Sequence, residues 1–409
     1  MIKNNLQTIL LGVITLLVVF LYFLSAQPLV KLQKNYQNIF INPIKEEKKA
    51  LTYLNELRQG AGLIPFNSND ILKRASRHHV NYLIKNHTYG HYEDQNRSGF
   101  TGKFASDRVR KEGYNTSLVI ENVSSNNRNY KESIDGLFAA IYHRFAFLDF
   151  QGDEIGIAIQ QNQRYPTQTS YVYTIGSSML NLLYKKNTNP SKKILNEALD
   201  HHKALSNKMI TYPFDQQRDV PPVFFNELPD PLPNYDVSGF PVTISFNQAF
   251  FKNIKLLKFK LFKKESEIGL NSIVYDYKTD PNRRLNRFSF ALLPLERLEW
   301  NQEYQVKFLA VVDRDFIEKE WSFKTRNPKI PLHKIEDEYQ TINIRVNEAN
   351  LFYFPPKTAK DLLHNVRYDS DFKMEFFDQN TVKLTALKHS FLVKELEIGS
   401  HHLKLNIQN

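Results

Sequence analysis

The 409-residue sequence contains no cysteine. This absence excludes disulfides, thiol nucleophiles, cysteine metal ligands and a lipidated N-terminal cysteine. Any metal ion would therefore have to bind through His, Asp or Glu side chains. An exported protein without disulfides is also more typical of bacteria than of eukaryotic secretion.

Long low-complexity tracts are absent as well. Hydrophobic residues make up 42% of the chain and charged residues 24%, which is the composition of a globular protein with packed cores. At roughly 100 to 200 residues per domain, the length predicts two or three domains.

Nucleic-acid-binding motifs are missing although the chain is basic. Lys and Arg number 54 against 43 Asp and Glu, giving a net charge of +11. The basic residues are spread along the chain rather than gathered in an arm, so we expect no nucleic-acid partner. Two interpretations remain, a solvated charged surface and attraction to an anionic envelope surface.

One long apolar run is present, TILLGVITLLVVFLYFLSA at residues 8–26. Its 19 uncharged residues approach the ~20 that cross a bilayer as a helix. It is either a signal peptide cleaved after the small pair Ser25 and Ala26 or an uncleaved anchor, and its length favours the anchor. We therefore predict a transmembrane signal anchor at residues 1–26. The rest then faces the periplasm or the cell exterior, and the protein is secreted if the segment is cleaved.

Residues 45–180 mix helical and strand patterns. Leu54 and Leu57 share one face of a helix, Asn69 is placed to cap the next one, and DEIGIAIQQ alternates like a half-buried strand. His79 falls on the apolar stripe of the second helix, which predicts a core histidine. Residues 130–147 are predicted as a single helix. Helices interleaved with a few strands indicate an α+β or layered α/β/α domain.

The later part of the chain differs in its sequence pattern. Residues 181–236 are predicted as a linker, helical at 192–209 and then proline-rich at VPPVFFNELPDPLPNY. Short alternating runs such as PVTISFN and YQVKFLAVV predict an all-β sandwich at 237–327. Runs such as TINIRVN and TVKLTAL predict a small C-terminal β domain at 328–409.

Five residues carry side chains suited to chemistry: His87, His91, Glu121, His143 and Arg144. Imidazole and carboxylate groups bind zinc and also serve as general acids and bases. The histidines lack the local H-E-x-x-H spacing that would place two ligands on one helical face. Spacing alone therefore does not define a shared site.

The order of several short motifs is similar to that of a known family. NELRQGAGLIPF, ILKRASRHHVNYL, GHYEDQNRSGFTG, DRVRKEGY, IENV, IYHRFAFLDF and DEIGIAI follow one another along residues 47–178. In this order they resemble the motifs of the bacterial CAP superfamily, named after cysteine-rich secretory proteins, antigen 5 and pathogenesis-related 1 proteins.

The resemblance implies an α-β-α sandwich with a cleft lined by two histidines and two acids. His91, Glu121 and His143 match three of these four positions. The second acid of animal members falls near Ala140, so the tetrad is incomplete here. The family's usual tryptophan is likewise replaced around Leu137. Glu132 and Asp135 lie on the same predicted helix, but one to two turns away.

Three interpretations of this cleft stay open. His91, Glu121 and His143 form a ligand-binding or zinc site, a hydrogen-bonded structural cluster, or a catalytic zinc site with an open position for water. Neighbouring groups are predicted to be structural. Asp153 and Glu154 form the polar turn before a strand, Asn122 bonds backbone, and Arg144 is a surface arginine.

Residues 238–326 resemble the Ig-like domains of bacterial surface proteins through VSGFPVTISFN, FSFALLPLERLEWNQEYQVKF and EWSFKT. Together these features predict a membrane-anchored envelope protein whose CAP cleft binds a small molecule, lipid, peptide or glycan. The Ig-like region would be a spacer or adhesion module that can contact protein partners. The alternative function is a metal-dependent hydrolase acting on envelope polymers or peptides.

Overall fold

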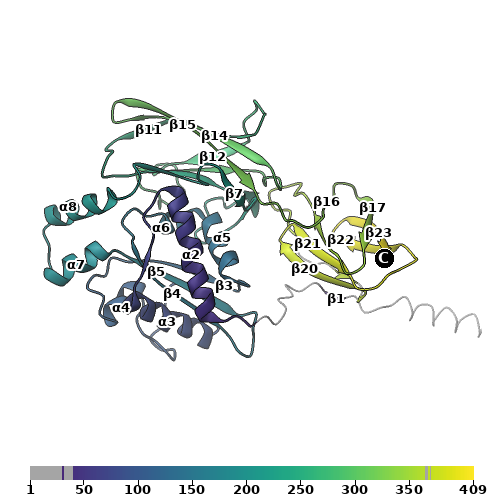
Figure 1. The fold of residues 1–409 in the computed structure, drawn as a ribbon, viewed down its shortest axis with the longest axis horizontal. Helices are drawn as coiled ribbons and strands as arrows, with labels where there is room; N and C mark the ends of the chain where they lie inside the picture. The colour runs from purple at the N-terminus through teal and green to yellow at the C-terminus, as the bar shows by residue number, and fades with distance from the viewer. Residues whose placement is uncertain (1–29, 32–39, 364–366, 369) are drawn as a thin grey trace, which may run out of the picture. The chain divides into compact units, whose positions relative to one another are not determined.

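The computed structural model describes residues 30–31, 40–363, 367–368 and 370–409, and it divides into two units (Figure 1). One unit comprises residues 36–327 with 358–360. The other comprises residues 1–35, 328–357 and 361–409. No helix in the described ranges has the length and apolarity that crossing a membrane requires. The predicted anchor, residues 8–26, lies outside these ranges.

The unit around residues 36–327 begins with a three-layer domain. Its sheet has the order β2-β4-β5-β3, built from Asn67–Ser68, Glu154–Gln161, Thr169–Gly176 and Ile120–Ser125. Helix α2 (Pro43–Ala61) packs with α5 (Tyr130–Ala139) and α6 (Ile141–Phe147) on one face. Helices α3 (Asp70–Lys85) and α4 (Ala105–Lys111) lie on the opposite face (Figure 1). The domain is the α-β-α sandwich that the sequence predicts.

Alternation along β4 explains how both faces are covered. Ile155, Ile157 and Ile159 join the core under α2, whereas Ala158 packs against Val80 of α3. Gly156 lies between Ile155 and Ile157 in β4. An added Cβ at this position would come within 2.1 Å of the Leu72 backbone. Glycine at this position therefore lets α3 pack directly on the sheet.

A β-sandwich follows, formed by two four-stranded sheets. One has the order β12-β13-β10-β6, from Ser272–Tyr275, Ser289–Pro294, Val242–Phe246 and Met209–Tyr212. The other has the order β11-β14-β15-β7, from Ile254–Lys263, Glu303–Val312, Asp315–Thr325 and Gln217–Val220. Strands β8 (Val223–Phe225) and β9 (Val237–Gly239) pair separately.

The segment expected to be a linker thus contributes strands to the sandwich. Within 181–236, α7 (Ser178–Lys186) ends and α8 (Lys192–Lys203) follows, and then β6 pairs with β10 and β7 pairs with β15. Proline-rich composition suggested an unpaired connector, but strand pairing supplies partners from distant parts of the chain. The predicted helix at 192–209 ends at Lys203 for the same reason, since β6 begins at Met209.

One hydrophobic core runs through both halves of this unit, from Ala50 in α2 to Phe323 in β15. At the junction, the rings of Phe138 and Tyr212 lie 4.6 Å apart between centroids. The α-β-α sandwich and the β-sandwich therefore share buried apolar surface rather than being joined by a flexible spacer.

The unit that starts at Pro328 has its own core and two sheets. One sheet orders β16 (Leu332–Lys334), β18 (Ala349–Tyr353), β21 (Thr381–Ala386) and β20 (Phe372–Asp378). The other orders β17 (Tyr339–Arg345), β23 (His401–Gln408) and β22 (Lys394–Ile398). A short pair joins β1 (Val30–Lys31) to β19 (Arg367–Tyr368).

Candidate functional site

The structure brings His91, Glu121 and His143 together. His91 Nδ1 donates to Glu121 Oε1 at 3.1 Å, and the rings of His91 and His143 stack with centroids 6.3 Å apart. The side chain of His91 is 40% exposed and that of His143 is 18% exposed. Both imidazoles therefore keep contact with solvent, whereas the side chain of Glu121 is only 4% exposed.

Three different elements position these groups. His91 comes from the loop between α3 and α4, Glu121 from β3, and His143 from α6. The predicted single helix at 130–147 is broken at Ala140, whose backbone is extended with ψ 112°. This break starts α6 on a new axis and places His143 beside Asn122 of β3.

Arg108 of α4 donates hydrogen bonds to Glu121. Its Nη2 donates to Glu121 Oε1 at 2.9 Å and to Oε2 at 2.8 Å, and the guanidinium is fully buried. Burial alone would raise the pKa of Glu121, but the hydrogen bond from His91 and the Arg108 charge outweigh it and keep the pKa below the usual range. Glu121 is therefore ionised at neutral pH.

Asn122 determines which ring nitrogen of His143 carries the proton. Asn122 Nδ2 donates to the His143 carbonyl at 2.9 Å, so its Oδ1 faces His143 Nδ1, also at 2.9 Å. By this network Nδ1 carries the proton and Nε2 presents a lone pair. Burial first, and then the neighbouring His91, lower the pKa of His143 to about 4, so this imidazole is neutral at pH 7.

A further acid, Glu227, reaches this site from the loop between β8 and β9. Its Oε2 lies 3.9 Å from His143 Nε2, and its side chain is 6% exposed. Within the described residues, neither carboxyl oxygen has a hydrogen-bond partner of ordinary geometry. Burial raises the pKa of Glu227 to about 8, against the smaller lowering effects of the Ile141 and Tyr142 backbone amides and of Arg144.

Sequence reasoning missed Glu227 because it lies in the proline-rich segment, 84 positions after His143 by residue number. No local pattern marks it. Its position beside His143 depends on the loop between β8 and β9, which brings Glu227 to the backbone amides of Ile141 and Tyr142 at the start of α6.

His79 lies beneath the site as a fully buried residue. Its Nδ1 is 2.9 Å from Glu93 Oε1 and its Nε2 donates to the Gly90 carbonyl at 3.0 Å. These bonds anchor the loop that carries His91. The prediction of a core histidine is therefore confirmed.

The other candidates lie away from the cleft. His87 is exposed and contacts Gln168 at 2.9 Å. Glu132 accepts from the Arg128 backbone, and Asp135 accepts from the Tyr53 hydroxyl. The prediction of a surface position for Arg144 is wrong, since it is fully buried between the two halves of the unit.

Asp153 and Glu154 also serve the structure. Asp153 Oδ1 accepts from the Ser178 backbone N–H at 2.7 Å, at the start of α7. Glu154 Oε2 accepts from the Tyr114 hydroxyl at 2.8 Å. Both carboxylates are thereby engaged at the ends of β4 and β5.

The residues do not fit the expected zinc ligand set. Across the described ranges, no group of three or more His, Asp or Glu side chains is placed to hold a metal ion. Glu121, the acid of that set, already accepts from Arg108 through both oxygens and from His91. A carboxylate paired with a buried guanidinium and an imidazole N–H is a hydrogen-bond anchor rather than a metal ligand. These three side chains therefore give the metal-dependent hydrolase alternative no support.

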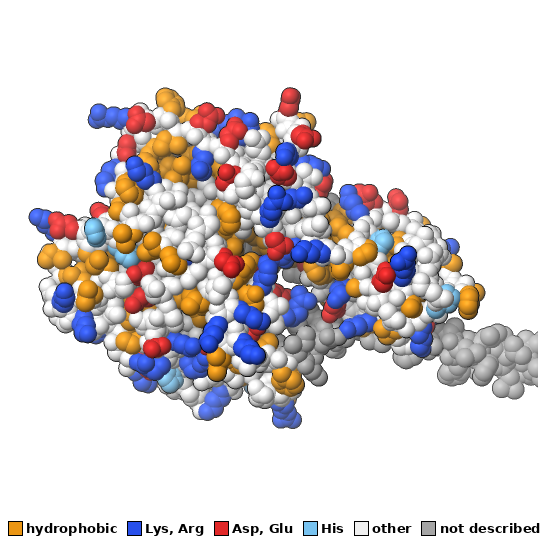
Figure 2. All heavy atoms as spheres, in the orientation of Figure 1, with side chains coloured by type: hydrophobic (Ala, Val, Ile, Leu, Met, Phe, Trp, Pro, Cys, Tyr) orange, Lys and Arg blue, Asp and Glu red, His pale blue; other side chains and the backbone are white. Residues whose placement is uncertain are grey.

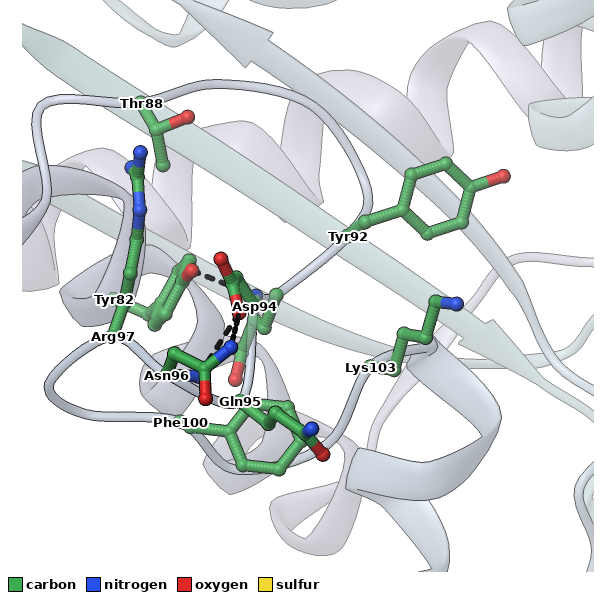
Figure 3. A pocket seen from close by; sticks show the side chains of 10 residues that line it. Tyr82, Thr88, Tyr92, Asp94, Gln95, Asn96, Arg97, Phe100 and Lys103 are labelled. Atoms are coloured by element: carbon green, nitrogen blue, oxygen red, sulfur yellow. Dashed lines mark hydrogen bonds between the residues drawn. The ribbon is translucent and has the colours of Figure 1, made fainter.

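A pocket of about 560 Å³ is lined largely by residues of the loop that carries His91 (Figure 3). Tyr92, which follows His91 in the chain, lines it together with Lys103, Arg97 and Phe100. In Figure 3, the Tyr82 hydroxyl accepts from the Asp94 backbone N–H, a bond of 2.8 Å that fixes the pocket wall. The lining mixes aromatic, cationic and amide groups.

Part of the chain matches a known protein family. The family model of the cysteine-rich secretory protein family, CAP, matches residues 51–175. The chain therefore contains a CAP domain at these positions. The match does not extend to the β-sandwich, so its Ig-like assignment stays a prediction. No curated protein matches the chain.

Two solved structures are similar to about a third of the chain. An outer surface protein from Borrelia burgdorferi is 18% identical with a TM-score of 0.30, covering 34% of this chain and 96% of its own. An extracellular protein containing an SCP domain from Bacillus anthracis is 14% identical with a TM-score of 0.29, covering 33% of this chain. This chain spans 41% of the length of that second protein.

Proposed function

We propose that this protein is a non-enzymatic envelope protein, held outside the cytoplasm by residues 8–26, whose CAP cleft binds a polar ligand, with a glycan as the favoured class. The proposal is carried by the stacked pair of His91 and His143 at the opening of the cleft. Glu121 and Asn122 engage both Nδ1 atoms. The Nε2 atoms of His91 and His143 therefore remain available to hydrogen-bond a ligand.

The surroundings of the histidine pair support a glycan rather than a lipid. Tyr89 and Tyr92 flank His91 in the chain and are 78% and 65% exposed. The pocket along the same loop contributes Lys103, Arg97 and amide groups. Exposed aromatic rings beside many polar groups suit a ligand with apolar faces and hydroxyl edges.

The charge of the surface fits a role at an anionic envelope. Figure 2 shows Lys and Arg side chains interspersed with Asp and Glu over the visible face rather than gathered in one patch. Such a distribution favours diffuse attraction to an anionic polymer or membrane over a single high-charge docking site.

Binding can be tested with the purified 409-residue chain and soluble oligomers of N-acetylglucosamine. Histidine Cε1 NMR signals report on both cleft rings, and calorimetry gives the affinity. We expect the His91→Ala plus His143→Ala variant to lose binding by about tenfold or more. His87→Ala is the matched control, since His87 is exposed and lies outside the cleft.

The proposal is wrong for glycans if the wild-type signals of His91 and His143 do not move at any oligomer concentration. It is also wrong if the double variant binds as tightly as the His87→Ala control.

A further inference from the structure

The cleft is bounded by more than the CAP domain. Glu227 belongs to the loop between β8 and β9, outside the residues 51–175 that match the CAP family. This loop is fixed in place because Asn282 Nδ2 donates to the Asp230 carbonyl at 2.7 Å and to the Tyr142 hydroxyl of α6 at 3.0 Å. The loop between β8 and β9 thus places an acid beside His143.

The Glu227 carboxyl is buried at the start of α6, where the backbone amides of Ile141 and Tyr142 approach it without forming a hydrogen bond of ordinary geometry. Within the described part of the chain, neither oxygen has a partner of ordinary geometry, and the side chain is only 6% exposed. Leaving a buried carboxyl without a well-formed hydrogen bond costs stability. A group that carries this cost is placed to receive something from outside the chain.

The distance between Glu227 and His143 limits which group of a ligand can lie between them. Glu227 Oε2 and His143 Nε2 are 3.9 Å apart, too far for a direct hydrogen bond. One oxygen atom can still lie at about 2.8 Å from both. His143 Nε2 offers only a lone pair, so the group between them has to donate to His143.

We infer that Glu227 is a specificity-determining residue of the cleft and that a sugar hydroxyl of the ligand bridges it to His143. The hydroxyl donates its proton to His143 Nε2, and its oxygen accepts from the protonated Glu227 carboxyl. This inference rests on the proposed glycan-binding function.

The protonation state of Glu227 is consistent with this bridge. Burial favours the uncharged form and raises the pKa of Glu227 to about 8, so the carboxyl is available as a donor at neutral pH.

Two substitutions of Glu227 by side chains of similar size test whether the bridging group of the ligand is a hydroxyl. Glu227→Gln keeps a donor at the same position, so we expect affinity for N-acetylglucosamine oligomers to stay within about threefold of wild type. Glu227→Leu removes donor and acceptor, and we expect a loss of about tenfold or more. Glu318→Leu, an exposed acid of β15, is the control and should not change affinity.

The outcomes separate this inference from the proposed function. If wild type does not bind the oligomers, the proposed function has failed. If wild type binds and Glu227→Leu binds equally well, only the role of Glu227 is overturned. If Glu227→Gln loses as much affinity as Glu227→Leu, a donor at this position is not what binds the ligand, and the inference is again wrong.

Discussion

Arg144 Nη1 donates to the backbone carbonyl of Pro241 at 2.7 Å. This bond joins helix α6 of the CAP domain to the segment between β9 and β10. The same guanidinium lies over the rings of Phe240 and Tyr212, at 4.7 and 5.1 Å from their centroids. Arg144 therefore connects the CAP domain to the β-sandwich through buried contacts.

Replacing Arg144 should destabilise the whole unit. Arg144→Ala leaves the carbonyls of Phe138 and Pro241 without their donor and opens a cavity, so we expect a loss of about 3–5 kcal/mol in the free energy of unfolding. Urea denaturation followed by fluorescence measures it. Arg164→Ala, an exposed arginine, should stay within about 0.5 kcal/mol of wild type. Equal stability of the two variants would contradict the assignment.

The CAP domain should not fold without the β-sandwich. Excising residues 43–180 exposes the core face around Phe138 that packs on Tyr212. We expect this fragment to lack a cooperative thermal transition and near-UV circular dichroism, whereas residues 36–327 show both. A sharply melting fragment would show that the shared core is dispensable.

Glu227 should make stability fall with rising pH. Its folded-state pKa of about 8 lies above the ordinary value of 4.5, so the unfolded chain releases this proton first. Stability from this group is full below pH 4.5 and is lost as pH rises through about 8. Glu227→Gln should therefore match wild type near pH ~4 and exceed it by roughly 2–4 kcal/mol at pH ~9. Urea titrations across this range test it, and a constant difference at all pH values would contradict it.

Two glycines of the CAP domain should respond in opposite ways to alanine. At Gly156 of β4 an added Cβ would meet the Leu72 backbone at 2.1 Å, so Gly156→Ala should cost about 3 kcal/mol or more. At Gly136 of α5 an added Cβ would meet no atom within 4 Å apart from its chain neighbours and the backbone of its own helix, so Gly136→Ala should stabilise the helix by about 0.5–1 kcal/mol. Thermal denaturation of the two variants provides the comparison.

Local patterns predicted much of the CAP fold. Asn69 accepts from the Leu72 backbone as the predicted cap of α3, and the alternation of DEIGIAIQQ corresponds to β4. Signals of this kind depend on neighbours in the chain, which a sequence displays directly. The order of the motifs then indicated which histidines and which acid share the cleft.

Long-range packing accounts for what the sequence did not reveal. Arg144 looked like a surface residue because its partner Pro241 lies 97 positions later. Glu227 carried no signal because its position depends on the path of the loop between β8 and β9, which reaches the start of α6. The break at Ala140 was hidden for the same reason, since helix propensity alone favours continuing from α5 into α6.

The pairing of β1 with β19 has a consequence for how the protein would stand on a membrane. Val30 and Lys31 pair with the C-terminal unit, and only residues 27–29 separate them from the predicted anchor at 8–26. A chain of this length reaches at most about 14 Å. With the anchor inserted, the C-terminal unit would therefore be held within about that distance of the bilayer surface.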